Sequence, residues 1–251
     1  MHDMTTRKGI AWNLAWEFEG EDGYDAATAA LLAILPETFF WDRVAWVGQR
    51  GADLAPLTID RLVAAVNADY RTWQVASSTD RLPDLDLTCH RVDDSLQLRL
   101  LIRDRAWHDL GRTLVGGLER LTSALAGALP ERSCFGIGGG VRPAFQPTLE
   151  YPRCADEPGR DVFAYGQVID VLDRRNLEPR NLERWAEVGL RDWAEALGRV
   201  AAAPLPPDAR RSELGAVVIQ TWTDALGDEA ALIDACARHD RWLAAVLQPP
   251  A

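Results

Sequence analysis

The sequence predicts an α+β fold in which helices cover a mainly antiparallel sheet. Two neighbouring runs, residues 85–91 and 95–103, alternate apolar with polar side chains, and short polar residues between them fit the turn of a β-hairpin. A helix is predicted directly afterwards, because apolar residues recur at spacings of three and four: Trp107, Leu110, Leu114, Leu118, Leu121, Leu125 and Leu129. We expect this stripe to pack on the dry face of the hairpin as the core.

The N-terminal segment begins with a predicted strand over residues 9–18, where bulky apolar side chains alternate with smaller or polar ones. Residues 24–35 are rich in Ala and Leu and precede Pro36, so they predict a helix. Residues 39–47 predict a short strand.

Two segments then lead to the hairpin. Thr58 is placed to cap a short helix over residues 59–66. Polar residues dominate residues 67–81, which therefore predict a surface loop.

Glycine and proline dominate the region after the central helix. Residues 133–138 predict a short strand, whereas residues 139–160 predict a long irregular connection because several prolines follow Gly138, Gly139 and Gly140.

The second half contains the same kinds of element. Residues 162–172 predict a strand, and residues 181–200 predict one helix whose apolar stripe runs through Trp185, Gly189 and Trp193. The apolar residues 215–223 predict a buried strand. Asp228 is placed to cap the last helix.

These elements predict a first half that resembles the split β-α-β arrangement, followed by two further strand–helix units. We expect a single domain over residues 1–251, within which the sequence allows sub-halves 1–141 and 161–251 joined by a Gly/Pro-rich loop.

Composition narrows the classes of function. The formal net charge is −11 and the pI is near 4.9, so nucleic acid is a poor partner, because a phosphate backbone favours clustered Lys and Arg. The sequence has neither a membrane-spanning run nor the apolar segment of a signal peptide, and we expect a cytoplasmic protein. Its cysteines are scattered, which suits buried thiols in a reducing compartment.

Candidate chemistry is sparse. The glycine run at residues 136–140 lacks the third glycine of a dinucleotide loop, since Val141 holds that position, and it predicts a flexible turn. Cys236 and His239 are three residues apart on a predicted helix, but a zinc site needs a second pair, so we expect Cys236 to pack in the helix and His239 to be solvated. No serine has the glycine-flanked setting of a nucleophile. We therefore expect no catalytic residue, no metal and no cofactor.

Acidic residues are the remaining feature. One cluster of acidic residues near residue 20 contains no basic residue. A second set lies just before the predicted hairpin, in its first strand and in its turn. Together the two sets could form a negative surface that meets a cationic protein. The residues that we expect to bind a partner are Glu17, Glu19, Glu21, Asp22, Asp84, Asp86, Asp93 and Asp94.

The order of elements resembles a known family. The bulky N-terminal strand, the Ala/Leu helix ending near Trp41, the segment 57–66, the hairpin at 85–102, and the late segment 207–211 leading into 214–218 are together similar to bacterial polymorphic-toxin immunity proteins, in particular the immunity protein 52 family. The resemblance implies a cytoplasmic antitoxin that binds a cognate toxin, blocks its active site and carries no catalytic residues.

The sequence thus favours a non-enzymatic immunity protein that occludes a toxin domain, which could have a basic active-site cleft. Two alternatives stay open. One is a metal-assisted small-molecule transferase using Asp84 and Asp86, which are spaced to project from one strand face. The other is a structural or adaptor subunit.

Overall fold

The computed structural model describes residues 9–17, 29–31, 33–34, 43–46, 55–56, 72–77, 85–92, 95–128, 134–135, 139–143, 167–187 and 189–248. Its strands are β1 (Gly9–Glu17), β2 (Arg43–Trp46), β3 (Ala55–Pro56), β4 (Thr72–Ser77), β5 (Leu85–Val92), β6 (Ser95–Arg103), β7 (Cys134–Phe135), β8 (Gly139–Pro143), β9 (Ile169–Asp173), β10 (Arg210–Leu214) and β11 (Val217–Thr221). Its helices are α3 (Asp104–Ala128), η1 (Arg174–Leu177), α4 (Pro179–Glu187), α5 (Arg191–Ala202) and α6 (Glu229–Leu247), and residues 29–31 and 33–34 are also helical.

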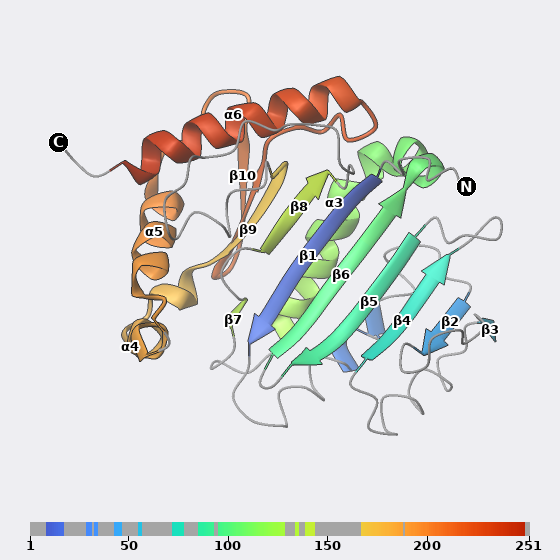
Figure 1. The fold of residues 1–251 in the computed structure, drawn as a ribbon, viewed down its shortest axis with the longest axis horizontal. Coiled ribbons are helices and arrows are strands. Elements are labelled where there is room, and N and C mark those ends of the chain that lie inside the picture. The colour runs from blue at the N-terminus through green and yellow to red at the C-terminus, as the bar shows by residue number, and fades with distance from the viewer. Residues whose placement is uncertain are drawn as a thin grey trace, which may run out of the picture.

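The predicted α+β fold is confirmed. The described strands form one sheet in the order β10-β11-β9-β8-β1-β6-β5-β4-β2-β3, with β7 beside β1, and their pairings are antiparallel (Figure 1). Because β8 pairs with β9, the sheet continues from the N-terminal strands into the C-terminal ones. Among the described helices, none is long and apolar enough to span a membrane.

The first core is the predicted two-layer block. Trp12 lies opposite Leu100, and Leu100 lies opposite Leu87, so these three side chains share one face of the sheet, where each is fully buried. The α3 helix contacts β1 and β6, and its buried side chains include Leu118, Leu121 and Leu125. The hairpin and the amphipathic helix are therefore confirmed, since periods of two and of 3.6 produce matching apolar faces.

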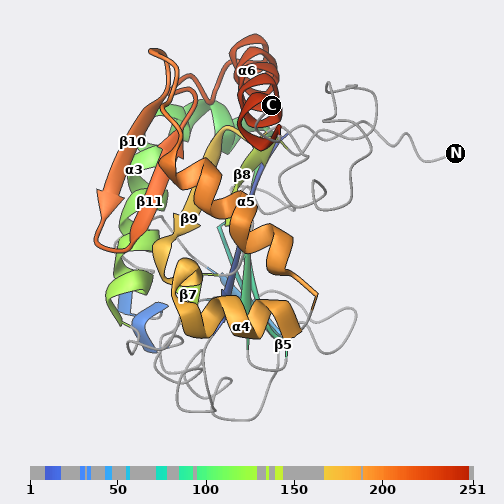
Figure 2. The ribbon, with the colours of Figure 1, turned by 90° about the vertical axis from the view of Figure 1, so that its left-hand side faces the viewer.

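The second core lies on the opposite face. Val141 pairs with both Trp12 and Ile169, which places Ile169 on the α3 face, and strand alternation turns Leu172 the other way. There it packs in a cluster with Val218 of β11 and with side chains of α5 and α6: Trp193, Leu197, Val200 and Leu243. Figure 2 shows α3 and α6 on opposite sides of the sheet.

The predicted loop over residues 67–81 is wrong for residues 72–77, which form β4. Trp73 lies opposite Cys89 and Val75 lies opposite Leu87, so β4 continues the sheet beyond β5. The prediction failed because polar residues on both sides of this short strand dominate the window.

The predicted irregular connection after residue 138 is wrong for residues 139–143, which form β8. Gly140 lies where β8 approaches β9 closely: a Cβ there would be 2.5 Å from the carbonyl oxygen of Ile169 and would overlap the side chain of Gln167. The glycine therefore serves close strand packing and not a flexible turn.

The single helix predicted over residues 181–200 is also wrong. The segment holds two helices, α4 and α5, which are separated at Gly189, where φ is +80°. Glycine adopts this left-handed conformation readily and so allows the chain to turn. Gly189 is exposed and does not belong to the apolar stripe.

The C-terminal region contains one strand that the sequence did not predict and one helix cap that it did. Strand β10 was not predicted; it pairs with β11 through a turn in which Gly215 has φ +65°. The predicted cap of the last helix is confirmed, because the Asp228 carboxylate accepts hydrogen bonds from the backbone N–H groups of Ala230 and Ala231. The helix predicted over residues 59–66 lies outside the described residues.

Candidate functional site

A buried polar cluster lies between α6 and the sheet. His239 and Asp240 come from α6, Asp170 comes from the second position of β9, and Trp222 directly follows β11. The relative exposures of Asp170, His239 and Asp240 are 2%, 1% and 4%. Ionisable side chains are rarely this buried unless they are paired, so their contacts decide what the cluster does.

His239 is held between two carboxylates. Its Nε2 lies 3.2 Å from Oδ1 of Asp170, and its Nδ1 lies 3.2 Å from Oδ1 of Asp240. The indole Nε1 of Trp222 donates to the other oxygen of Asp170 at 3.0 Å. The imidazole also meets the Trp222 ring edge to face, with 5.1 Å between centroids. These contacts fix both the position and the orientation of the imidazole ring.

The two carboxylates determine the charge of His239. Burial alone would lower its pKa, but the negative charges and hydrogen bonds of Asp170 and Asp240 raise the pKa of His239 to about 9. Burial acts in the opposite sense on Cys236, one turn earlier on α6, and raises the pKa of its thiol far above the ordinary value, with Asp240 and Asp170 adding to the effect. The cluster at neutral pH is thus an imidazolium between carboxylates beside an un-ionised thiol.

The prediction that His239 is solvated is wrong. The signal that places it inside is helical spacing: Leu232, Cys236, His239 and Leu243 follow one another at intervals of three or four and are all buried. A carboxylate at Asp170, within the apolar run of β9, is a second signal, because a buried acid in a strand needs a partner.

This cluster is sealed from solvent. A general base or nucleophile must reach the group on which it acts, and His239, Asp170 and Cys236 are each at most 2% exposed. Within the part of the chain that the structure describes, no group of His, Cys, Asp and Glu has the arrangement of a metal site. The arrangement is therefore suited to holding α6 on the sheet.

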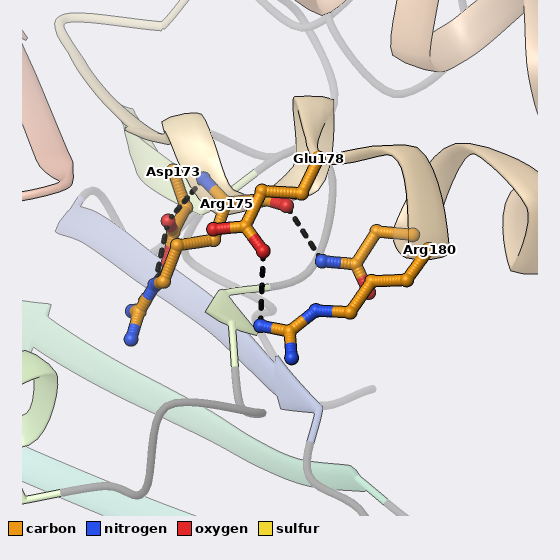
Figure 3. A network of polar contacts seen from close by, with 5 residues as sticks. Asp173, Arg175, Glu178 and Arg180 are labelled. Carbon is orange, nitrogen blue, oxygen red and sulfur yellow. Dashed lines mark hydrogen bonds and ion pairs between the residues drawn. The ribbon is translucent and has the colours of Figure 1, made fainter.

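A second polar network follows β9. The Arg175 guanidinium donates to both carboxylate oxygens of Asp173, at 2.6 Å for its closest nitrogen, and Arg180 pairs with Glu178 at 3.0 Å (Figure 3). The amide of Asn181 donates to the carbonyl oxygen of Arg175 at 2.6 Å. These contacts fix the turn from β9 through η1 into α4.

The structure describes two of the residues predicted to bind a partner. Glu17 ends β1 and lies opposite Ser95, the residue that follows Asp93 and Asp94 in the sequence. Asp86 lies opposite Leu101, which in turn lies opposite Ala11. Ala11 and Glu17 are separated by roughly 20 Å along an extended strand, so Asp86 and Glu17 lie toward opposite ends of the sheet. The other predicted residues, Glu19, Glu21, Asp22, Asp84, Asp93 and Asp94, lie outside the described residues.

Comparison with known proteins gives no family assignment. No family model matches the chain, and no curated protein matches it. Among solved structures, the Pseudomonas aeruginosa T6SS protein PA0821 is similar at 12% sequence identity, with a TM-score of 0.47, over 92% of this chain and 73% of that one. We draw no functional conclusion from this distant likeness.

Proposed function

We propose that this chain is a non-catalytic immunity protein that acts in the cytoplasm, binds a cognate bacterial toxin domain and occludes its active site. The observation that supports the proposal most is the strand register at one end of the sheet. Glu17 and Ser95 lie side by side there, and acidic residues follow Glu17 and precede Ser95 in the sequence. Two acidic segments far apart in the sequence thus start from neighbouring strand ends.

Acidic segments of this kind suit one class of partner. A toxin that handles a polyanion needs a basic cleft, and carboxylates attract that cleft as phosphates do, which raises the association rate and adds specificity. The net charge of −11 has the sign that this attraction requires.

The sealed His239 cluster supports the non-catalytic part of the proposal. Among the residues that the structure describes, it is the group whose types come nearest to acid–base chemistry, yet its side chains contact one another and are shielded from any substrate. A protein that works by occlusion needs a rigid surface and has no need of an open reactive cluster.

The proposal expects a toxin-domain gene beside this one. The test is binding to the purified protein that the neighbouring gene encodes, measured by titration calorimetry at low and high salt. Reversal of two acids by E19K/E21K, or separately by D93K/D94K, should weaken binding at least tenfold at low salt, and the loss should shrink as salt screens the charges. The matched control is E183K/E187K, which makes the same charge change at two exposed positions of α4.

Each outcome is decisive. Absence of binding by the unaltered protein would refute the proposal as a whole. Equal affinities for the reversed variants and the α4 control would leave binding intact but exclude these acidic residues as its site.

A further inference from the structure

The contacts of α6 suggest a conformational device. Around His239, the groups that face it are Asp170 from β9, Trp222 after β11, and Asp240, Cys236 and Trp242 from α6 itself. The nearby Arg238 is directed elsewhere, because it pairs with Asp208 and Asp234 and donates to the Trp222 carbonyl oxygen. His239 is thus the basic group positioned between the two buried carboxylates.

The number of protons on the imidazole decides whether a positive charge lies between the two buried carboxylates. A protonated ring has two N–H donors, one toward Asp170 and one toward Asp240, each 3.2 Å away. A neutral ring carries no charge and turns a nitrogen lone pair toward one of the carboxylates, although Asp170 keeps the hydrogen bond from Trp222. Because both carboxylates are at most 4% exposed, water does not replace the lost positive charge while α6 stays in place.

Loss of the proton from His239 would affect the contact between α6 and the sheet, and not the core on the other face. Only Asp170 belongs to the sheet, whereas Asp240 belongs to α6, so separating the helix from β9 hydrates both acids at once. The neighbouring core of α3, β1 and β6 lies on the other face and shares none of these groups.

We propose that protonated His239 is a lock that keeps α6 docked on β9 and β11, and that deprotonation releases α6 while the β1–β6–β5 core stays folded. This device goes beyond the proposed immunity function and does not depend on it. The pH range over which the lock opens follows from the pKa of His239, which is raised to about 9 from an ordinary 6.5. The Cys236 thiol, whose pKa burial raises far above the ordinary value, stays un-ionised over that range.

The test is amide hydrogen exchange of the intact protein at pH 6.5 and pH 10, with each rate corrected for the intrinsic effect of pH. Protection of residues 230–247 should fall on the order of a hundredfold between the two values, as expected for a shift of this size. Protection of β5, β6 and α3 should change little. Constant protection of α6, or an equal loss in α3, would overturn the proposal.

Two variants separate the lock from general effects of alkali. H239Q places an uncharged amide between the carboxylates, so its α6 should exchange rapidly at pH 6.5 already and show no further dependence on pH. E195Q alters an exposed acid of α5 and should behave like the unaltered protein. If H239Q does not fold, the histidine ring signals of the unaltered protein, assigned by NMR, give an independent measurement: a His239 titration near 6.5 would refute the lock.

Discussion

Asp170 and His239 form an ion pair that joins strand β9 to the last helix, with 3.2 Å between Oδ1 and Nε2 and almost no exposure of either side chain. Together with Asp240 it places one imidazole between two carboxylates in a low-dielectric interior. Breaking such a group is costly, because the remaining charge stays buried without compensation.

The ion pair predicts a stability that declines with alkali. The folded-state pKa of His239, about 9, is above the ordinary 6.5, so its contribution is complete below pH 6.5 and is lost as pH rises through 9. The free energy of unfolding should therefore fall by about 3 kcal/mol across this window. Urea unfolding at pH 6.5 and pH 9.5 measures this change. In H239Q most of the difference between the two pH values should be absent.

We expect removal of one of the two buried carboxylates to lower the free energy of unfolding substantially. D170N deletes the negative charge that faces His239, and we expect the free energy of unfolding to fall by about 3 kcal/mol at pH 7. The control is D224N, which weakens the exposed ion pair with Arg210, where side-chain exposures are 61% and 46%. That substitution should cost less than about 1 kcal/mol. Similar unfolding midpoints of the two variants in urea would contradict a stabilising role of the buried Asp170–His239 ion pair.

Two glycines predict opposite responses to alanine. G140A would force a Cβ against the Ile169 carbonyl oxygen at the β8–β9 pairing and should destabilise the protein by about 1–3 kcal/mol. G127A adds a Cβ in α3 with nothing within 4 Å and should stabilise it by up to about 1 kcal/mol, since alanine favours helix. Thermal unfolding of both variants checks the signs, and equal shifts would refute the close packing at Gly140.

The cap of α6 predicts a moderate cost. D228A removes the acceptor for the N–H groups of Ala230 and Ala231, so the free energy of unfolding should fall by about 1 kcal/mol. D228N, which retains a side-chain oxygen, should recover most of this. A full loss in D228N would indicate that charge at the helix N-terminus matters more than the hydrogen bonds.

The parts of the fold that the sequence predicted are those in which one physical signal dominates. Strict alternation along β1, β5 and β6 and the stripe of α3 gave the first core, and the Asp228 cap located the start of α6. The short strands β4 and β8 were missed because their pairing partners, and not their own composition, make them strands. Gly140 shows this most clearly, since its role appears only once β9 lies beside it.

The buried cluster could be predicted only in part. The helical spacing of Cys236, His239 and Leu243 indicates an interior position, but the partner Asp170 is remote in sequence and becomes adjacent only through the sheet. Register likewise decides how the predicted acidic residues are distributed, since it separates Asp86 from Glu17.

The pairing of Gly140 with Asp170 has a consequence for dissection of the chain. A cut in the chain between β8 and β9 would leave two fragments. Each would have an edge strand, β8 or β9, whose backbone N–H and C=O groups had been paired with the other fragment. Fragments produced together should recombine into the native arrangement, whereas either one alone should aggregate.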